Sequence, residues 1–436
     1  MSKRSDLLFA LLIIGLFLFR TIYGLVAEFW FEDELQIYLI GLKSYTTHTW
    51  PFYGPDVVYT NTQIPGALQG LLVSAGFYIC PSPESPTILL NILSFLSLSF
   101  FAWYITKRVP GLPKWLVWVW VMTLPWTMNY STRVVNPSYV LIFSIPFFLS
   151  LIELLPIYKT TIIPKKLAFF LLGITPPLIM QLHLSFVLLF PFIALVGFFE
   201  LRNKSSAREK FYHAALFISG ALIGLSTVLP TWLMAENPKS ISSNIVFNVD
   251  NFKNIVTILT RYLSFASYEI PYVLGGNTEE RMRVINYNIW MAPFALFLLV
   301  FGFFLIAVFV YAFFKNPDNG PWKKIKYLTL LGFILVFLSF FFSIKGPSSH
   351  TFYLFLPLPV MYSFSCYAWL WNKYKFWKQL MFISIICVVF FYAGAGIYNY
   401  KHKSLYKNRE KVVEAINKKD YKVLGERRAD KWGYGY

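Results

Sequence analysis

Eleven long apolar runs, separated by polar segments, place the strongest constraint on how this chain can fold. Each run approaches the ~20 residues that an α-helix needs to cross the hydrocarbon core of a bilayer. Hydrophobic side chains make up 57% of the 436 residues and charged ones only 14%, so a water-soluble fold could not bury the apolar surface. We therefore expect an all-α integral membrane protein, a polytopic bundle of about eleven transmembrane helices. The expected spans are residues 7–28, 86–106, 114–129, 137–157, 166–181, 184–201, 212–233, 289–314, 326–344, 351–371 and 379–398.

The positions of the basic residues give the bundle a direction in the membrane. The net charge is +18, but the Lys and Arg residues gather in short segments between alternate spans, which indicates cytoplasmic loops rather than a nucleic-acid partner. With a cytoplasmic N-terminus, the short inner segments hold Lys3, Arg4, Lys107, Arg108, Lys114, Lys159, Lys165, Lys166, Arg202, Lys204, Arg208, Lys210, Lys315, Lys323, Lys324, Lys326, Lys373, Lys375 and Lys378. The outer loops are much longer and hold fewer basic residues.

Two outer segments, residues 29–85 and 235–288, are too long to be simple turns. Amphipathic stretches in the first of them, residues 33–45 and 65–79, predict helices that lie in the membrane interface. Eleven spans also place the basic tail, residues 399–436, outside the cytoplasm, and part of this tail predicts a short amphipathic helix. The three cysteines, Cys80, Cys366 and Cys387, are too scattered for a metal site or a disulfide framework.

Three consecutive acidic residues, Glu32, Asp33 and Glu34, follow directly on the first span. In one interpretation Asp33 is a helix N-cap, with Gln36 three residues later as in a capping box. In the other interpretation one carboxylate is a general base that takes a proton from an acceptor hydroxyl at the membrane surface. The two roles are compatible, because a cap needs only one carboxylate oxygen.

The stretch FEDELQIY and the later stretch WPFYGPDVVYTNTQIPGALQGLL resemble the first outer loop of the GT-C membrane glycosyltransferases. The likeness is to the branch with bacterial relatives of the protein O-mannosyltransferases and the lipid A aminoarabinose transferase. The matching elements are Asp33-Glu34, Trp50-Pro51 and Pro65-Gly66. Three later segments match in the same order, residues 129–143, 181–189 and 345–359. The family often carries a further acidic residue where this chain has Asn136.

This resemblance implies a GT-C-like catalytic module over residues 1–398 and a polyprenyl-phosphate sugar donor. It implies transfer, with inversion, to a lipid, glycan or protein acceptor on the extracytoplasmic side of a bacterial inner membrane. Asp33 would be the base, and Glu34 would orient it or the acceptor. The residues expected to bind the donor phosphate or the substrate are Arg133, His183, Lys345, His350 and Tyr353. Their alternative role is structural, as interfacial or packing side chains.

Several alternatives stay open at this point. A divalent cation held by Asp33 and Glu34 is one, although the sequence establishes no cofactor. A flippase for a lipid-linked glycan, an O-antigen-type polymerase with a diphosphate-linked donor, and a structural membrane protein are the other functions considered. Arg20 lies within the first span, where a charge is costly unless it is paired. We expect it to reach Glu28 or the acidic residues, or to line a groove for a lipid phosphate.

Overall fold

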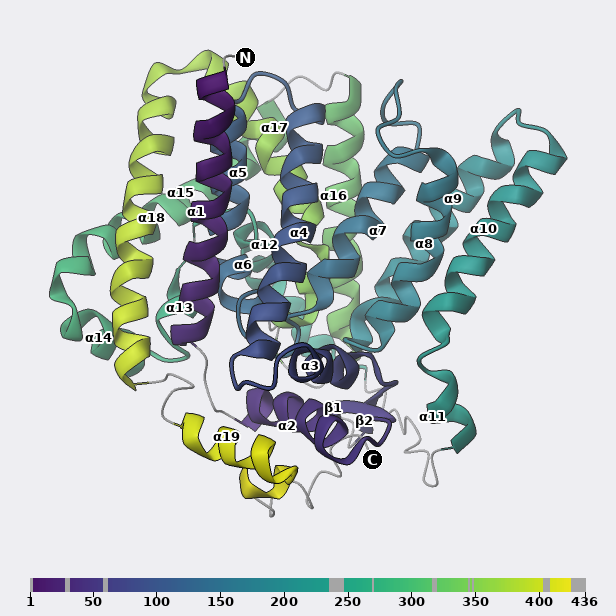
Figure 1. The fold of residues 1–436 in the computed structure, drawn as a ribbon. Helices are drawn as coiled ribbons and strands as arrows, with labels where there is room; N and C mark the ends of the chain where they lie inside the picture. Colours follow the sequence, from purple (N-terminus) through teal and green to yellow (C-terminus); the bar gives the residue numbers. More distant parts are fainter. Residues whose placement is uncertain are drawn as a thin grey trace.

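A computed structural model describes residues 3–27, 32–57, 62–234, 247–268, 270–315, 320–343, 346, 349–402 and 408–424. Within these ranges the chain is almost entirely helical, with one short antiparallel hairpin. Most of the helices run side by side in a bundle (Figure 1). The bundle contains α1 (Lys3–Ala27), α4 (Ser85–Arg108), α5 (Lys114–Thr123), α6 (Pro125–Tyr130), α7 (Val140–Leu154), α8 (Lys165–Met180), α9 (Phe190–Arg202), α10 (Ala207–Leu225), α12 (Ile255–Ser264), α15 (Ala292–Lys315), α16 (Gly320–Ser339), α17 (Pro357–Lys373) and α18 (Lys375–His402).

Every predicted span coincides with helical segments of the bundle. Six of the described helical segments are long and apolar enough to cross a membrane. These are Ser5–Ala27, Ser85–Arg108, Leu184–Arg202, Ile289–Lys315, Gly320–Phe342 and Lys375–His402. The other five predicted spans fall on helices that are shorter, broken or more charged, so the count of eleven stays a prediction.

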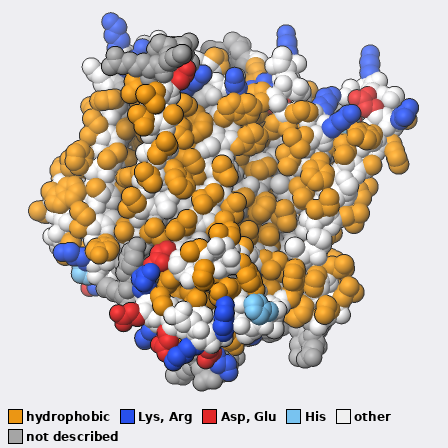
Figure 2. Space-filling view, in the orientation of Figure 1, with side chains coloured by type: hydrophobic (Ala, Val, Ile, Leu, Met, Phe, Trp, Pro, Cys, Tyr) orange, Lys and Arg blue, Asp and Glu red, His pale blue; other side chains and the backbone are white. Residues whose placement is uncertain are grey.

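The outer surface of the bundle is that of a protein surrounded by lipid. Figure 2 shows hydrophobic side chains covering the middle of the molecule, with mainly Lys and Arg along its upper edge and a mixture of basic and acidic side chains at its lower end. Large apolar side chains in this region are well exposed, for example Leu18 at 50% and Phe314 at 76%. An apolar surface of this extent would aggregate in water, whereas helices satisfy their backbone hydrogen bonds within the bilayer. The protein is therefore an integral membrane protein built from helices.

A layer of short elements crosses one end of the bundle, opposite the edge that is rich in Lys and Arg (Figure 1). Its helices α2 (Glu32–Thr47) and α3 (Leu68–Ile79) confirm the two helices predicted for the first outer segment. They pack closely, and the Tyr38 hydroxyl of α2 donates a 2.8 Å hydrogen bond to the carbonyl of Pro83 beyond α3. The sequence did not predict the hairpin between them, β1 (Tyr53–Val57) and β2 (Thr62–Pro65), which pairs Asp56 with Gln63.

The predicted tail helix is also present, as α19 (Arg409–Lys418), and it lies against this layer. The Arg409 guanidinium forms a 2.7 Å ion pair with Glu84, at the turn between α3 and α4. Just beyond α19, the Lys419 ammonium lies 3.8 Å from the centroid of the Tyr45 ring in α2. The described part of the tail thus shares a face with α2 and α3. The side of the membrane on which that face lies stays a prediction.

The remaining described elements connect these parts. They are the helices α11 (Leu229–Met234), α13 (Pro271–Leu274) and α14 (Thr278–Tyr287), and the 3-10 helices η1 (Leu184–Leu189), η2 (Val249–Asn254), η3 (Ile289–Met291), η4 (Phe340–Phe342), η5 (Ser349–Phe355) and η7 (Tyr421–Leu424). Two of them, η1 and η5, pack against each other next to the α2–α3 layer. They matter for the site, because they carry residues that the sequence singled out.

Candidate functional site

The centre of the bundle contains a broken helix. The third predicted span is divided into α5 and α6 at Leu124, whose ψ of 131° is extended rather than helical. Pro125 begins α6, and since proline has no N–H it cannot continue the hydrogen-bond ladder of α5. The last carbonyls of α5 therefore need donors from elsewhere. In an apolar interior, an unsatisfied carbonyl costs free energy comparable to a lost hydrogen bond.

Arg20 of α1 supplies one of these donors, to the Met122 carbonyl, and also binds Thr127 on the other side of the break. The Thr127 hydroxyl donates to the Val121 carbonyl at 3.3 Å. Its side chain is 1% exposed, and its Nη1 donates to the Met122 carbonyl at 2.5 Å. Its Nη2 donates to the Thr127 carbonyl at 3.1 Å, and Nη1 also donates to the Thr127 hydroxyl at 3.2 Å. Glu28, one of the partners expected from the sequence, lies outside the described residues. The contacts that are described assign Arg20 a structural role at the break, as the cap of α5 and α6.

Two tyrosines complete the hydrogen bonding of this broken helix. The Tyr392 hydroxyl of α18 donates to the Thr123 carbonyl at 3.4 Å. The Tyr353 hydroxyl of η5 lies 3.3 Å from the Trp126 carbonyl and 2.9 Å from the Ser131 hydroxyl. Tyr353 is fully buried. Its hydroxyl therefore joins η5 to the segment after α6, and a contact of Tyr353 with a donor phosphate stays a prediction.

Arg133 lies in this same segment, at the end of the bundle nearest the α2–α3 layer. Its guanidinium forms a fork on Asn129, with Nε 2.9 Å from the backbone carbonyl and Nη2 2.7 Å from Oδ1. The side chain is 8% exposed and close enough to the Tyr23 hydroxyl of α1 for an electrostatic interaction. Arg133 is thus a buried guanidinium in a fixed orientation, and its binding of a donor phosphate stays a prediction.

Tight packing fixes the position of the Arg133 segment. A Cβ added to Gly24 of α1 would lie only 2.1 Å from the Thr132 carbonyl oxygen, so the two backbones are in direct contact there. The Asn91 amide of α4 donates to the same carbonyl at 2.7 Å. Only a glycine at position 24 permits this approach. Arg133 is therefore held between α1 and α4.

His183 directly precedes η1 as its N-cap and is partly buried. Its Nδ1 accepts a 3.1 Å hydrogen bond from the backbone N–H of Ser185 and lies 2.6 Å from the Ser185 hydroxyl. Because Nδ1 accepts from a backbone N–H, the neutral imidazole carries its proton on Nε2.

The nearby Gln181 is fully buried and connects separate parts of the chain. Its side-chain oxygen accepts from the Leu68 N–H of α3 and from the Thr227 hydroxyl, and its amide donates to the Gly224 carbonyl of α10.

Four of the predicted site residues cannot be placed fully. Lys345 lies outside the described residues, and so do the side chains of Asp33, Glu34 and His350. Their helical backbones are described for Asp33 and Glu34 in α2 and for His350 in η5. The chain passes from Ala27 to Glu32 in five residue steps, so the start of α2 lies within about 18 Å of the end of α1. That end is one turn beyond Gly24, which touches the Arg133 segment.

The structure thus gathers several elements that the sequence singled out, and it places them at one end of the bundle. The Arg133 segment contacts η5 through Tyr353, and η5 packs on η1, which follows His183. No three His, Cys, Asp or Glu side chains come together as metal ligands among the described residues. Whether Asp33 and Glu34 hold a cation is not tested, since their side chains lie outside the described set.

Sequence reasoning missed the residues that build this end of the bundle, notably Gln181, Asn91 and the pair Thr123 and Thr127. One signal was available, because Pro125 interrupts an apolar run between two threonines. That pattern is typical of a helix break whose carbonyls are satisfied by neighbours. No family model, curated protein or solved structure matches this chain.

Proposed function

We propose that the protein is an integral membrane glycosyltransferase that uses a polyprenyl-phosphate sugar donor. The observation that supports this best is the convergence of the Arg133 segment, η1 and η5 at the end of the bundle that the α2–α3 layer crosses. A buried Arg at this end, together with the carboxylates at the start of α2, would supply both charges that such a transfer needs. The enzyme would act on the extracytoplasmic face of a bacterial inner membrane, and the acceptor would be a lipid, glycan or protein hydroxyl.

The proposed reaction is a single displacement at the anomeric carbon of the sugar. Asp33 takes the proton of the acceptor hydroxyl while that oxygen attacks the anomeric carbon. The bond from this carbon to the phosphate oxygen breaks, so polyprenyl phosphate leaves with an additional negative charge and the configuration inverts. Glu34 orients Asp33 or the acceptor.

The leaving phosphate needs positive charge and hydrogen-bond donors that are already in position. Arg133 meets both needs, because Asn129 fixes its guanidinium before any substrate arrives. His183 is proposed as a further contact of the donor, held in place by the hydrogen bond between its Nδ1 and the Ser185 N–H. Lys345, His350 and Tyr353 are proposed as further donors from the last outer segment. Preorganised donors lower the barrier because they do not reorient during the reaction.

The test is a comparison of two conservative substitutions, Asp33→Asn and Asp250→Asn. Asp250 is also on a predicted outer segment, but its side chain is 86% exposed and paired only with the exposed Lys253. Each variant replaces the chromosomal copy, and extracted lipids are analysed by mass spectrometry for polyprenyl-phosphate sugars. We expect the donor to accumulate with Asp33→Asn, because a general base commonly contributes about 10²–10⁴-fold to the rate. Asp250→Asn should leave the donor at its normal level.

Protein abundance in the membrane must be equal in the two strains, so that accumulation reports chemistry rather than folding. A purified protein that transfers sugar from the accumulated lipid to an acceptor, and loses this ability with Asp33→Asn, would complete the case. Normal donor levels with Asp33→Asn would show that Asp33 is not the base. Normal levels in a strain without the protein would refute the glycosyltransferase itself.

A flippase for a lipid-linked glycan is the second candidate, favoured by the broken helix α5–α6 and by the buried Arg20. Discontinuous helices and intramembrane charges are typical of transporters. Among the described contacts, however, Arg20 binds carbonyls and hydroxyls of its own protein. Liposomes with a fluorescent polyprenyl-phosphate sugar separate the two functions, since only a flippase moves the probe between leaflets.

A further inference from the structure

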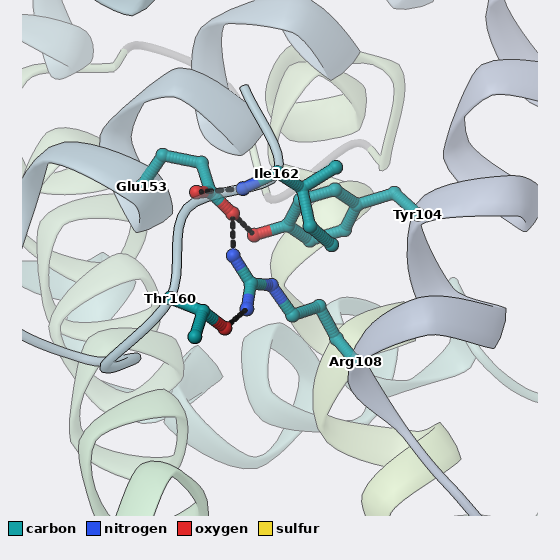
Figure 3. A network of polar contacts seen from close by, with 5 residues as sticks. All are labelled: Tyr104, Arg108, Glu153, Thr160 and Ile162. Carbon is teal, nitrogen blue, oxygen red and sulfur yellow. Dashed lines mark hydrogen bonds and ion pairs between the residues drawn. The ribbon is translucent and has the colours of Figure 1, made fainter. Parts of the chain in front are cut away.

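A buried ion pair lies at the end of the bundle opposite the candidate site. Three hydrogen-bond donors surround its carboxylate (Figure 3). Glu153 of α7 pairs with Arg108, which ends α4. The same carboxylate accepts a 2.6 Å hydrogen bond from the Tyr104 hydroxyl and a 2.8 Å hydrogen bond from the Ile162 N–H. The side chains of Arg108 and Glu153 are 5% and 1% exposed. Glu153 therefore fixes the Arg108 guanidinium rigidly in place.

Arg108 also lines an open pocket of about 650 Å³. The pocket lies between the turn after α4, the loop after α7, the start of α16 and the end of α17, so its walls come from distant parts of the sequence. Among the described residues that line it there is no carboxylate. The side chains that matter here are Lys107, Arg108, Tyr158, Trp322, Ser365 and Trp369.

The polar groups of this pocket are hydrogen-bond donors and cations. Lys107 is exposed, so its ammonium is available at the rim. Two residues that line it, Arg108 and Trp322, each have a buried N–H group, Nε and Nε1 respectively, without an acceptor among the described residues. Buried donors without an acceptor leave their positive ends uncompensated and favour an anion nearby. The pocket is therefore suited to a negatively charged group.

Tyr158 does not introduce a competing negative charge. Its ring lies 4.1 Å from the guanidinium carbon of Arg108. Burial, the largest influence, raises the pKa of its hydroxyl to about 12, although the Arg108 charge opposes this and Glu153 reinforces it. Tyr158 thus stays a neutral phenol under physiological conditions, and the pocket keeps its positive character.

A second pocket, of about 190 Å³, lies directly beside the first and is lined almost entirely by apolar atoms. It is formed by α12, α15, α16 and α17, and its walls include Phe309, Phe313 and Tyr362. The Tyr362 ring stacks on Trp322 of the first pocket, with centroids 4.9 Å apart and planes at 17°. Phe314 at the rim is 76% exposed, so this pocket faces the surrounding lipid. The polar and the apolar pocket are thus linked through this stacked pair of rings, one ring from each lining.

We propose that the two pockets together form a binding site for one anionic phospholipid. The phosphate group would lie beside Lys107 and Arg108, and part of one acyl chain would lie against Phe309 and Phe313. Soluble phosphate compounds share the headgroup chemistry, but they would leave the apolar pocket empty. The site lies at the end of the bundle that is rich in Lys and Arg. Basic loops face the cytoplasm, and the cytoplasmic leaflet carries the anionic lipids. It is separate from the proposed transferase site and does not depend on it.

The test measures lipid binding to the purified full-length protein in detergent by native mass spectrometry. The probes are phosphatidylglycerol, phosphatidylcholine with the same chains, and glycerol 3-phosphate as a headgroup without chains. The wild-type protein should bind phosphatidylglycerol with the highest affinity. Lys107→Gln should weaken this binding about fivefold, as expected for one basic residue near a phosphate. Lys204→Gln, an exposed lysine on another loop of the same face, should not change it.

A second variant, Leu330→Trp, fills the apolar pocket that Leu330 lines. It should weaken phosphatidylglycerol binding about tenfold, the equivalent of about two methylene groups kept out of the pocket. Binding of glycerol 3-phosphate should be unchanged.

Three outcomes would overturn the proposal. The first is equal affinity for phosphatidylglycerol and phosphatidylcholine, and the second is equal behaviour of Lys107→Gln and Lys204→Gln. The third is glycerol 3-phosphate binding as tightly as phosphatidylglycerol, which would identify a soluble phosphate compound as the occupant. None of these readouts requires sugar transfer, so a failure here leaves the proposed function untouched.

Discussion

Replacing Arg20 with methionine tests the claim that this buried charge holds a broken helix together. Methionine fills a similar volume with an unbranched chain, so the packing of α1 is largely preserved. The substitution removes every hydrogen bond from position 20 to the break between α5 and α6. The carbonyls of Met122 and Thr127 then lose the donors that Arg20 provides.

The expected loss can be worked out from these two carbonyls. The Met122 carbonyl is left without its described donor, which costs about 1–3 kcal/mol. The Thr127 carbonyl keeps its 3.1 Å hydrogen bond from the Ser131 N–H, so losing its second donor costs about 0.5–1.5 kcal/mol. Removing the guanidinium also removes the cost of burying a charge, which offsets part of this. We therefore expect Arg20→Met to lower the free energy of unfolding by about 1–3 kcal/mol. Arg20→Lys, which keeps the charge but loses the planar fork, should fall between methionine and the wild type.

The assay is reversible unfolding in mixed micelles, in which sodium dodecyl sulfate is titrated against a mild detergent and helix content is followed by circular dichroism. Arg283→Met is the matched control, because Arg283 is 61% exposed and its ion pair with Glu279 is at the surface. This control should cost no more than about 0.5 kcal/mol. If Arg20→Met unfolds at the same detergent ratio as Arg283→Met, the capping role of Arg20 is wrong.

Two other substitutions test how the Arg133 segment and the outer layer are fixed. Gly24→Ala places a methyl group 2.1 Å from the Thr132 carbonyl and should cost about 1–3 kcal/mol, whereas Gly15→Ala, with nothing within 4 Å, should be neutral or slightly stabilising. Equal unfolding of these two variants in the same assay would contradict the close contact. Gln181→Ala should cost about 2–4 kcal/mol, because buried groups of α3, α10 and Thr227 lose their partner. Thr227→Val removes one of these bonds and should cost about 1 kcal/mol; a Gln181→Ala variant as stable as Thr227→Val would refute the bridge.

Local sequence pattern carried a large part of the fold. Apolar runs identified the helical segments of the bundle except α12, which lies within the predicted outer segment 235–288, and amphipathic periodicity identified α2, α3 and α19. These signals are readable in one sequence because they depend on hydropathy within one helix length. The hairpin of β1 and β2 was missed, since its strands are only five and four residues long and contain prolines. Pro125 signalled the break in the third span, but not what would satisfy it.

The candidate site was also predicted only in part from the sequence. The resemblance to the GT-C family singled out Arg133, His183 and Tyr353, whose role stays a prediction. The sequence did not show that Tyr353 bonds Ser131, that Arg133 forks onto Asn129, or that Arg20 binds the Met122 carbonyl. The lysine- and arginine-lined pocket at the other end was also invisible, because its walls join residues from 107 to 369.

The sequence by itself determined that this chain is a helical membrane protein, because a bilayer admits apolar segments only when their backbone hydrogen bonds close within each helix. Only the tertiary structure decided which polar groups meet. These contacts join residues more than a hundred positions apart in the sequence, as between Arg20 and Thr127. The hydropathy of one helix carries no information about partners at that distance.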